Sequence, residues 1–174
     1  MRVGPTLERL RQTYPDDLRI VYKMHPLANH PFAQRAAQAA LAAQEQGKFM
    51  EMHELLPERY RSYNALAQTK AAALGLPPTQ GRSTQVQDAI FVDFARDLGL
   101  NEERFRADFA SEATRARITA ETREVVAIGA GGTPASFING RYLRGAAPFE
   151  KFQTLVDRAI GGVSAAGGGV GANP

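Results

Sequence analysis

The sequence predicts an α/β fold in which short strands are combined with a long helical region. Residues 18–24 are β-branched and partly alternating, which favours a strand. Residues 32–128 carry apolar side chains at helical spacing for most of their length. Residues 135–144 hold Asn139 and Gly140 between two short runs, the signal of a β-hairpin whose tight turn needs positive φ angles. We therefore expect helix, strand, helices, hairpin and a last helix, in that order.

Breakers and caps set the limits of each predicted helix. Pro5 suits a first turn, and helical spacing continues to Tyr14. Asn101 and Ser111 are expected to cap two helices, the second running to about residue 128. The expected helices cover residues 5–14, 32–46, 48–56 (ending near Pro57), 60–74, 84–98, a short stretch after Asn101, 112–128, and one that begins at Pro148; residues 77–81 are expected to form a loop.

The domain organisation follows from this order. Residues 1–160 are expected to form one domain with a helical insertion at about 32–128. Phe149, Phe152, Val156 and Ile160 recur at helical spacing and predict the buried stripe of the last helix. Residues 161–174 are rich in glycine and alanine, and we expect them to be disordered.

Composition excludes several classes of function. The net charge is +3, and basic residues are interleaved with acidic ones, so no phosphate-binding stripe is evident and nucleic acid is not an expected partner. No apolar run approaches the roughly 18–20 residues that span a bilayer. The first residues do not resemble a signal peptide, so the sequence as written is expected to stay in the cytoplasm.

The sequence contains no cysteine. Disulfides, thiolate metal ligands and thiol nucleophiles are therefore excluded for these 174 residues. The three histidines, His25, His30 and His53, match no common metal-binding spacing, and we expect neither a metal nor a cofactor.

Two further groups of residues were considered as sites. Glu51, Glu54 and Glu58 share a helical region, where paired carboxylates are usually solvated charges. The glycines at 129–132 follow a helix and precede a strand, which is the reverse of the order in a dinucleotide-binding loop. A turn leading into the hairpin is the better interpretation of these glycines.

Three stretches of sequence resemble DsbA-like thiol–disulfide oxidoreductases, which have a thioredoxin fold. Residues 23–31 followed by 39–49 are similar to the segment after the second strand of that family. Residues 131–140 are similar to its cis-proline loop and the following hairpin. Residues 2–7, from Arg2, are similar to the start of its first helix, directly after the Cys-x-x-Cys motif.

The resemblance implies a site. In the family, a low-pKa thiolate at a helix N-terminus exchanges with a substrate disulfide, and backbone groups beside a cis-proline pair with an extended substrate segment. By resemblance, Gly132, Thr133 and Pro134 take the substrate-binding positions, with a protein or peptide as partner. The family is typically periplasmic or otherwise located in the cell envelope.

The sequence departs from the family at the catalytic motif. The Cys-x-x-Cys motif and the first, central strand would both fall upstream of Arg2. We therefore expect a thioredoxin-like fold that lacks its central strand, is truncated after the motif and is redox-inactive. The alternative is a non-catalytic module for peptide binding or oligomerisation.

Loss of a central strand leaves unpaired backbone groups on both sides. Residues 18–24 and 135–138 would flank the gap, and each unpaired buried group costs about 1–3 kcal/mol. We expect one of three outcomes: direct pairing of these two segments, strand exchange in a homodimer, or poor folding.

Overall fold

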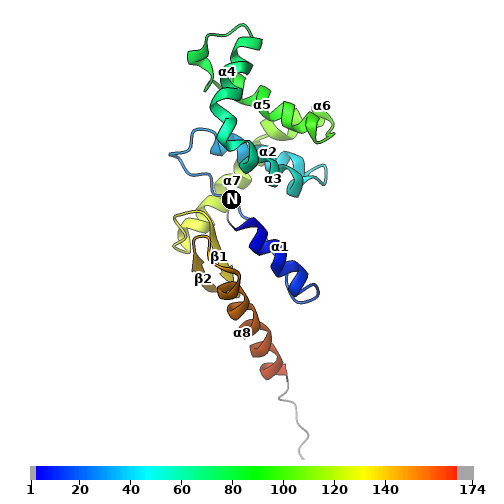
Figure 1. Ribbon diagram of the computed structural model, residues 1–174, viewed down its shortest axis with the longest axis vertical. Helices are drawn as coiled ribbons and strands as arrows, with labels where there is room; N and C mark the ends of the chain where they lie inside the picture. The colour runs from blue at the N-terminus through cyan, green and yellow to red at the C-terminus, as the bar shows by residue number, and fades with distance from the viewer. Residues whose placement is uncertain (1–2, 168–174) are drawn as a thin grey trace, which may run out of the picture. The chain divides into compact units, whose positions relative to one another are not determined.

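The computed structural model describes residues 3–167, with side chains as far as residue 161. The chain divides into two compact units. The hairpin unit contains the described residues of Met1–Tyr22 and Val126–Pro174, and the helical unit is Lys23–Val125. Figure 1 shows the elements of both units.

The helical unit is built from α-helices and two short 3-10 turns. Its elements are α2 (Ala33–Gln44), α3 (Phe49–Arg59), η1 (Tyr60–Ser62), α4 (Tyr63–Ala73), η2 (Pro78–Gln80), α5 (Thr84–Asp97), α6 (Glu102–Ala110) and α7 (Glu112–Ala127), of which the last two residues belong to the hairpin unit. Helices α3, α5 and α6 all contact α2. Ala39, Ala40 and Ala42 of α2 are buried, and their small side chains let these neighbours approach closely.

The predicted caps are confirmed. The Asn101 side chain accepts a hydrogen bond from the Arg104 N–H at 2.8 Å at the start of α6. The Ser111 hydroxyl accepts one from the Thr114 N–H at 3.0 Å at the start of α7. Each bond satisfies a backbone donor that a helix N-terminus otherwise leaves unpaired.

The predicted end of α3 near Pro57 is wrong. Pro57 lies inside the helix, which continues to Arg59. Proline lacks one backbone donor, but it does not prevent a further turn when neighbouring side chains are held by packing. Leu55 and Leu56 pack against the core of the helical unit and supply that packing.

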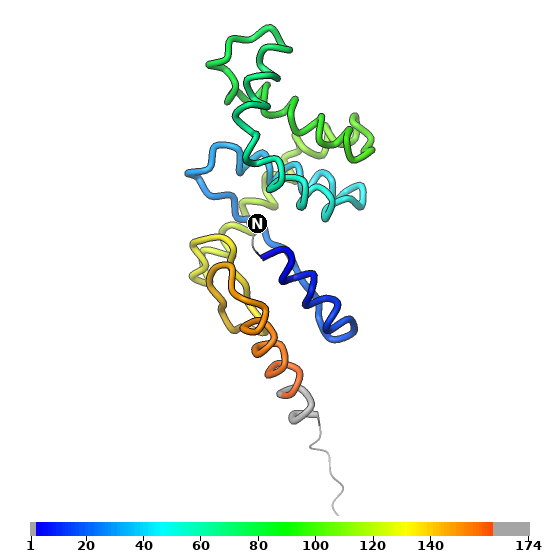
Figure 2. The backbone as a smooth tube through the Cα atoms, in the orientation of Figure 1, coloured from blue at the N-terminus to red at the C-terminus, as the bar shows by residue number. Residues whose placement is uncertain are grey.

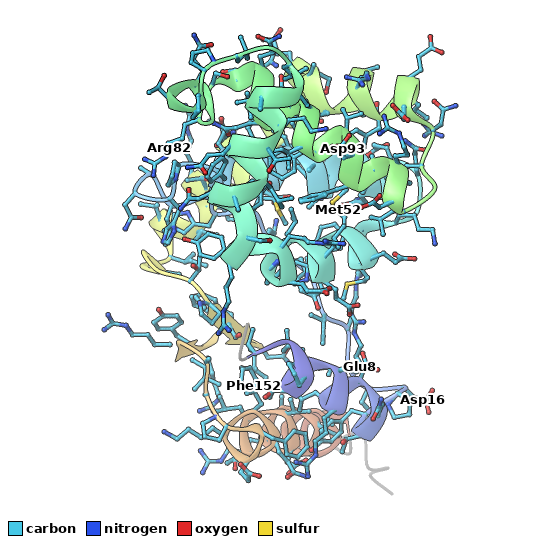
Figure 3. All side chains as sticks on the ribbon, turned by 45° about the horizontal axis from the view of Figure 1, so that its top comes forward. Glu8, Asp16, Met52, Arg82, Asp93 and Phe152 are labelled. Atoms are coloured by element: carbon cyan, nitrogen blue, oxygen red, sulfur yellow. The ribbon has the colours of Figure 1, made fainter. Side chains whose placement is uncertain are left out.

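An aromatic core holds the helical unit together. Phe91 and Phe105 are completely buried. The Phe32 and Tyr63 ring centroids lie 4.4 Å apart, and Phe91 and Phe94 meet edge to face at 5.9 Å. Met52 is buried in the same cluster and is labelled among the helices in Figure 3.

The hairpin unit contains α1 (Gly4–Thr13), β1 (Ala135–Ile138), β2 (Arg141–Arg144) and α8 (Phe149–Gly167). The two strands are antiparallel, with Phe137 opposite Tyr142. Asn139 and Gly140 have φ angles of 46° and 82°, as a tight turn requires, so the predicted hairpin is confirmed.

A small apolar cluster joins the two long helices of the hairpin unit. It consists of the buried residues Val3, Leu10, Phe149, Phe152 and Val156. Leu18 and Ile138 pack against its margin. Figure 3 labels Phe152 where α8 meets α1. Its α8 members, together with the partly buried Ile160, are the predicted stripe of the last helix.

The last helix extends into the residues that were predicted to form the tail. Helix α8 continues past residue 161 to Gly167. Alanine favours a helix that has already begun, so the glycines at 161 and 162 do not end it. The rest of the predicted tail, residues 168–174, lies outside the described residues.

Residues 18–24 do not form the predicted strand. Their exposure still alternates as in a strand: Leu18, Ile20 and Tyr22 are half-buried, whereas Arg19 and Val21 are exposed. Figure 2 shows the chain after α1 running on without a helical coil. The side-chain pattern therefore favoured a strand, but a strand also needs a hydrogen-bonded neighbour.

Direct pairing of residues 18–24 with residues 135–138, one of the three expected outcomes, does not occur among the described residues. Among the described residues β1 pairs with β2 alone. The end of the extended segment is held by side chains of α7 instead. The Met24 N–H donates to Glu121 Oε2 at 2.6 Å, and the Thr122 hydroxyl donates to the Met24 carbonyl at 3.4 Å.

Candidate functional site

The predicted site residues form one exposed loop between α7 and β1 in the hairpin unit. Gly132 and Thr133 are exposed and Pro134 is half-buried. The peptide bond between Thr133 and Pro134 is cis. The Pro134 carbonyl accepts a hydrogen bond from the Gly145 N–H at 2.9 Å, which fixes the end of the loop to the hairpin. We call residues 131–134 the proline loop.

Gly131 and Gly132 are not required by the fold of the proline loop. Neither has a positive φ angle, and a Cβ atom built on either would meet nothing within 4 Å. Gly129, just before the loop, differs because its φ of +79° favours glycine. The missing side chains at 131 and 132 therefore leave open space in front of the backbone, where another chain could approach.

An aromatic pair lies on the strands that follow the loop. The rings of Phe137 and Tyr142 stack with centroids 4.9 Å apart, and the two residues are 40% and 43% exposed. Sequence reasoning missed this pair as a candidate contact surface. The signal was present, because a two-residue turn at 139–140 places positions 137 and 142 opposite each other.

The histidines do not come together into a metal site. His30 Nδ1 lies 3.3 Å from the Tyr60 hydroxyl, and the His53 ring stacks on Phe49 at 5.6 Å. Within the described residues no group of three or more histidine and carboxylate side chains could hold a metal ion.

The glutamates of α3 behave as surface charges. Glu51 Oε1 lies 2.9 Å from Lys48 Nζ. The hydrogen bond from Lys48 lowers the pKa of Glu51, so this carboxylate is ionised and weakly basic. It is therefore a poor candidate for a general base.

A buried carboxylate that sequence reasoning missed is fully used by the fold. Glu121 is 8% exposed. One of its oxygens accepts from the Met24 N–H, and the other accepts from Arg117 Nε at 2.9 Å. Because both oxygens have partners within the fold, Glu121 anchors the extended segment to α7.

None of the described helices is long and apolar enough to cross a membrane.

Comparison with known proteins identifies the type of domain. Residues 78–157 match the family model of the DSBA-like thioredoxin domain. This range includes the proline loop, the hairpin and the first half of the last helix, and the match agrees with the α/β thioredoxin-like architecture.

Curated relatives match most of this chain but only a small part of their own length. The Na(+)/H(+) antiporter NhaA 1 of Salinispora arenicola (strain CNS-205) is 33% identical over 147 residues, which are 84% of this chain and 19% of that protein. The Na(+)/H(+) antiporter NhaA 3 of Salinispora tropica is 30% identical over 157 residues, 90% of this chain and 20% of that protein. The Na(+)/H(+) antiporter NhaA of Herminiimonas arsenicoxydans is 32% identical over 136 residues, 78% of this chain and 18% of that protein. The chain thus spans about a fifth of the length of these relatives.

Proposed function

We propose that the proline loop of this chain, whose residues 78–157 match the DSBA-like thioredoxin domain, binds extended polypeptide without redox chemistry of its own. Gly132, Thr133 and Pro134 form this site. The partner is a protein or peptide segment that presents its main chain to the loop.

The proposal rests on Gly131 and Gly132, because neither the backbone conformation nor the packing of the loop requires a glycine there. Positive φ and close packing are the usual reasons for glycine, and neither applies at 131 or 132. Close approach of another backbone is the remaining reason. Backbone groups of the exposed Gly132 and Thr133 would then pair with a peptide main chain.

The proposal assigns binding and not exchange, because thiol–disulfide exchange begins with attack by a thiolate. The 174 residues contain none. A domain that keeps a peptide-binding loop and lacks a thiol can hold unfolded or extended segments, but it cannot oxidise or reduce them.

Variants of the loop test the binding site. Gly132→Val places a branched side chain in the open space before the loop, and the geometry predicts normal folding because nothing lies within 4 Å of the new Cβ. We expect binding of a reduced, unfolded model polypeptide to weaken at least tenfold, measured by fluorescence anisotropy. Gly161→Ala is the matched control, since Gly161 also has open space and lies far along α8. Equal affinity of Gly132→Val and wild type would contradict the proposal.

A turnover assay tests the redox part of the proposal. The purified chain should not accelerate the reduction of insulin disulfides by dithiothreitol above the rate in buffer. A clear acceleration would contradict redox inactivity, whatever the result of the binding test.

A second candidate function rests on the names of the relatives. Most of this chain matches a fifth of proteins named as Na(+)/H(+) antiporters. In this candidate function, the domain acts in the cell envelope, beside a membrane transporter. Liposomes containing the Salinispora arenicola antiporter without its matching region should then retain the chain better than empty liposomes, and equal retention would exclude this candidate.

A further inference from the structure

The register of the hairpin assigns its side chains to two faces. Phe137 stacks on Tyr142, its partner across the ladder, so both rings lie on one face. Leu143 packs against the apolar cluster of the hairpin unit and therefore lies on the other face. Because side chains alternate along a strand, the strand residues two positions from each ring share its face. We call this face, which consists of Ala135, Phe137, Tyr142 and Arg144, the aromatic face.

The aromatic face begins at the proline loop. Ala135 directly follows Pro134 and lies opposite Arg144 in the ladder. The Gly145 N–H, next to Arg144 in the chain, donates to the Pro134 carbonyl at 2.9 Å. A polypeptide segment that leaves the loop along this face would therefore meet Arg144 first and the two rings next.

The aromatic face is accessible whether or not β1 has a second neighbour. A strand beside β1 would lie in the plane of the sheet and would not cover either face. Tyr142 and Arg144 belong to β2, which β1 separates from any such strand. Both rings are about as exposed as each other, Phe137 at 40% and Tyr142 at 43%, and Arg144 is exposed.

The charges near the loop and the hairpin determine which groups complement the face. Residues 125–149 contain Arg141 and Arg144 and no acidic residue. Neither arginine forms an ion pair in the part of the chain that the structure describes. An arginine binds a carboxylate through paired N–H donors, and an exposed pair of rings binds another aromatic ring. A carboxylate and an aromatic side chain therefore complement the aromatic face.

The spacing of the two groups follows from the geometry of extended chains. Arg144 and Tyr142 are two residues apart on β2, so their Cα atoms are about 6–7 Å apart. In an extended segment that lies along the face, residues two apart point to the same side at the same separation. We infer that the site selects polypeptide segments in which a carboxylate and an aromatic side chain are two residues apart.

This inference rests on the proposed function, because it is the proline loop that holds the main chain of the segment. The experiment uses the full chain and labelled peptides about ten residues long, with both ends blocked to remove the terminal charges. Four peptides share a neutral background and carry at the centre Asp-Thr-Phe, Asn-Thr-Phe, Asp-Thr-Ala or Asn-Thr-Ala. In fluorescence anisotropy, we expect the Asp-Thr-Phe peptide to bind about fivefold more tightly than the peptides that lack either group.

Variants on the two faces of β2 separate recognition from folding. Arg144→Gln should weaken binding of the Asp-Thr-Phe peptide about fivefold and leave the Asn-Thr-Phe peptide unchanged. Tyr142→Ser should weaken the Asp-Thr-Phe peptide and leave the Asp-Thr-Ala peptide unchanged. Arg141→Gln is the matched control, since Arg141 is an exposed arginine of the same strand on the other face, and it should change no affinity. A merely structural effect would change the affinity of all peptides alike.

The outcomes distinguish this inference from the proposed function. Gly132→Val should weaken all four peptides, because it blocks the loop. If it does so but wild type binds the four peptides equally, the proposed function stands and the inference is wrong. The inference is also wrong if Arg144→Gln weakens the Asp-Thr-Phe and Asn-Thr-Phe peptides to the same extent. If no peptide binds to a chain whose circular dichroism shows that it is folded, both are wrong.

Discussion

The helical unit has a large aromatic core, whereas the hairpin unit has a small apolar cluster and a strand with a described neighbour on one side only. In the helical unit, six aromatic rings pack on one another, two predicted caps are in place, and a buried glutamate uses both oxygens. Among the described residues of the hairpin unit, the buried cluster has five members, an aromatic pair is exposed, and β1 pairs with β2 alone. The difference predicts that most of the stability of the chain comes from the helical unit.

Truncation of one phenylalanine in each unit tests this comparison with the largest expected effect. Phe91→Ala should lower the free energy of unfolding of the helical unit by about 3–5 kcal/mol, because the ring is completely buried and leaves a cavity. Phe137→Ala should cost about 1 kcal/mol or less, the value of an exposed stacked pair. Urea denaturation followed by circular dichroism measures both, and similar losses would contradict the comparison.

Removal of the buried anchor tests how the extended segment is held. Glu121→Ala leaves the Met24 N–H and Arg117 without their acceptor and should cost about 2–3 kcal/mol. Glu124→Ala is the control: it removes an exposed partner of Lys23 and should leave stability unchanged within error. If the two variants have equal melting temperatures, Glu121 is not an anchor.

Two glycines, one just before the proline loop and one within it, sharpen the distinction between structural and binding roles. Gly129→Ala should destabilise the chain by about 1 kcal/mol, since an alanine at φ +79° is strained. Gly132→Ala should leave the free energy of unfolding unchanged. Thermal unfolding of the two variants decides this, and an equal loss at both positions would show that the loop needs both glycines for its fold.

The smallest expected effect concerns Tyr63, a buried aromatic residue of the helical-unit core whose side chain carries a hydroxyl. The Tyr63 hydroxyl is buried without a hydrogen-bond partner, and burial raises the pKa of Tyr63 well above its ordinary value of 10.0. Above about pH 10 the unfolded chain releases this proton and the folded chain keeps it, so stability falls as pH rises. Tyr63→Phe keeps the ring contacts and should be neutral or stabilising by about 1 kcal/mol.

The pH dependence of the free energy of unfolding of wild type and Tyr63→Phe checks this prediction. Between pH 9 and about 11, wild type should lose more stability than Tyr63→Phe. A variant that is markedly less stable at neutral pH would show that the hydroxyl has a partner after all.

Local chemistry made most of the fold predictable. Asn101, Ser111 and the Asn139–Gly140 turn act through bonds and φ angles within a few residues, so the sequence is sufficient to locate them. The extended segment at 18–24 shows where such reasoning ends. Its side chains alternate as expected, but a strand depends on a partner that local sequence does not contain.

The candidate site was predictable in part. Gly132, Thr133 and Pro134 were located through a resemblance, and the structure places them together in an exposed loop. The register of the hairpin decides which backbone groups of Ala135 and Phe137 face away from β2, because hydrogen-bonded and non-hydrogen-bonded pairs alternate along the ladder. Those facts require the three-dimensional structure.

Amide hydrogen exchange of the free chain, measured residue by residue by NMR, tests most directly the claim that β1 pairs with β2 alone. Ser136 and Ile138, which bond to β2, should exchange slowly, and Ala135 and Phe137 should exchange nearly as fast as unstructured amides. Strong protection of all four amides in a chain of monomeric mass would contradict the account, because the edge of β1 would then already be paired.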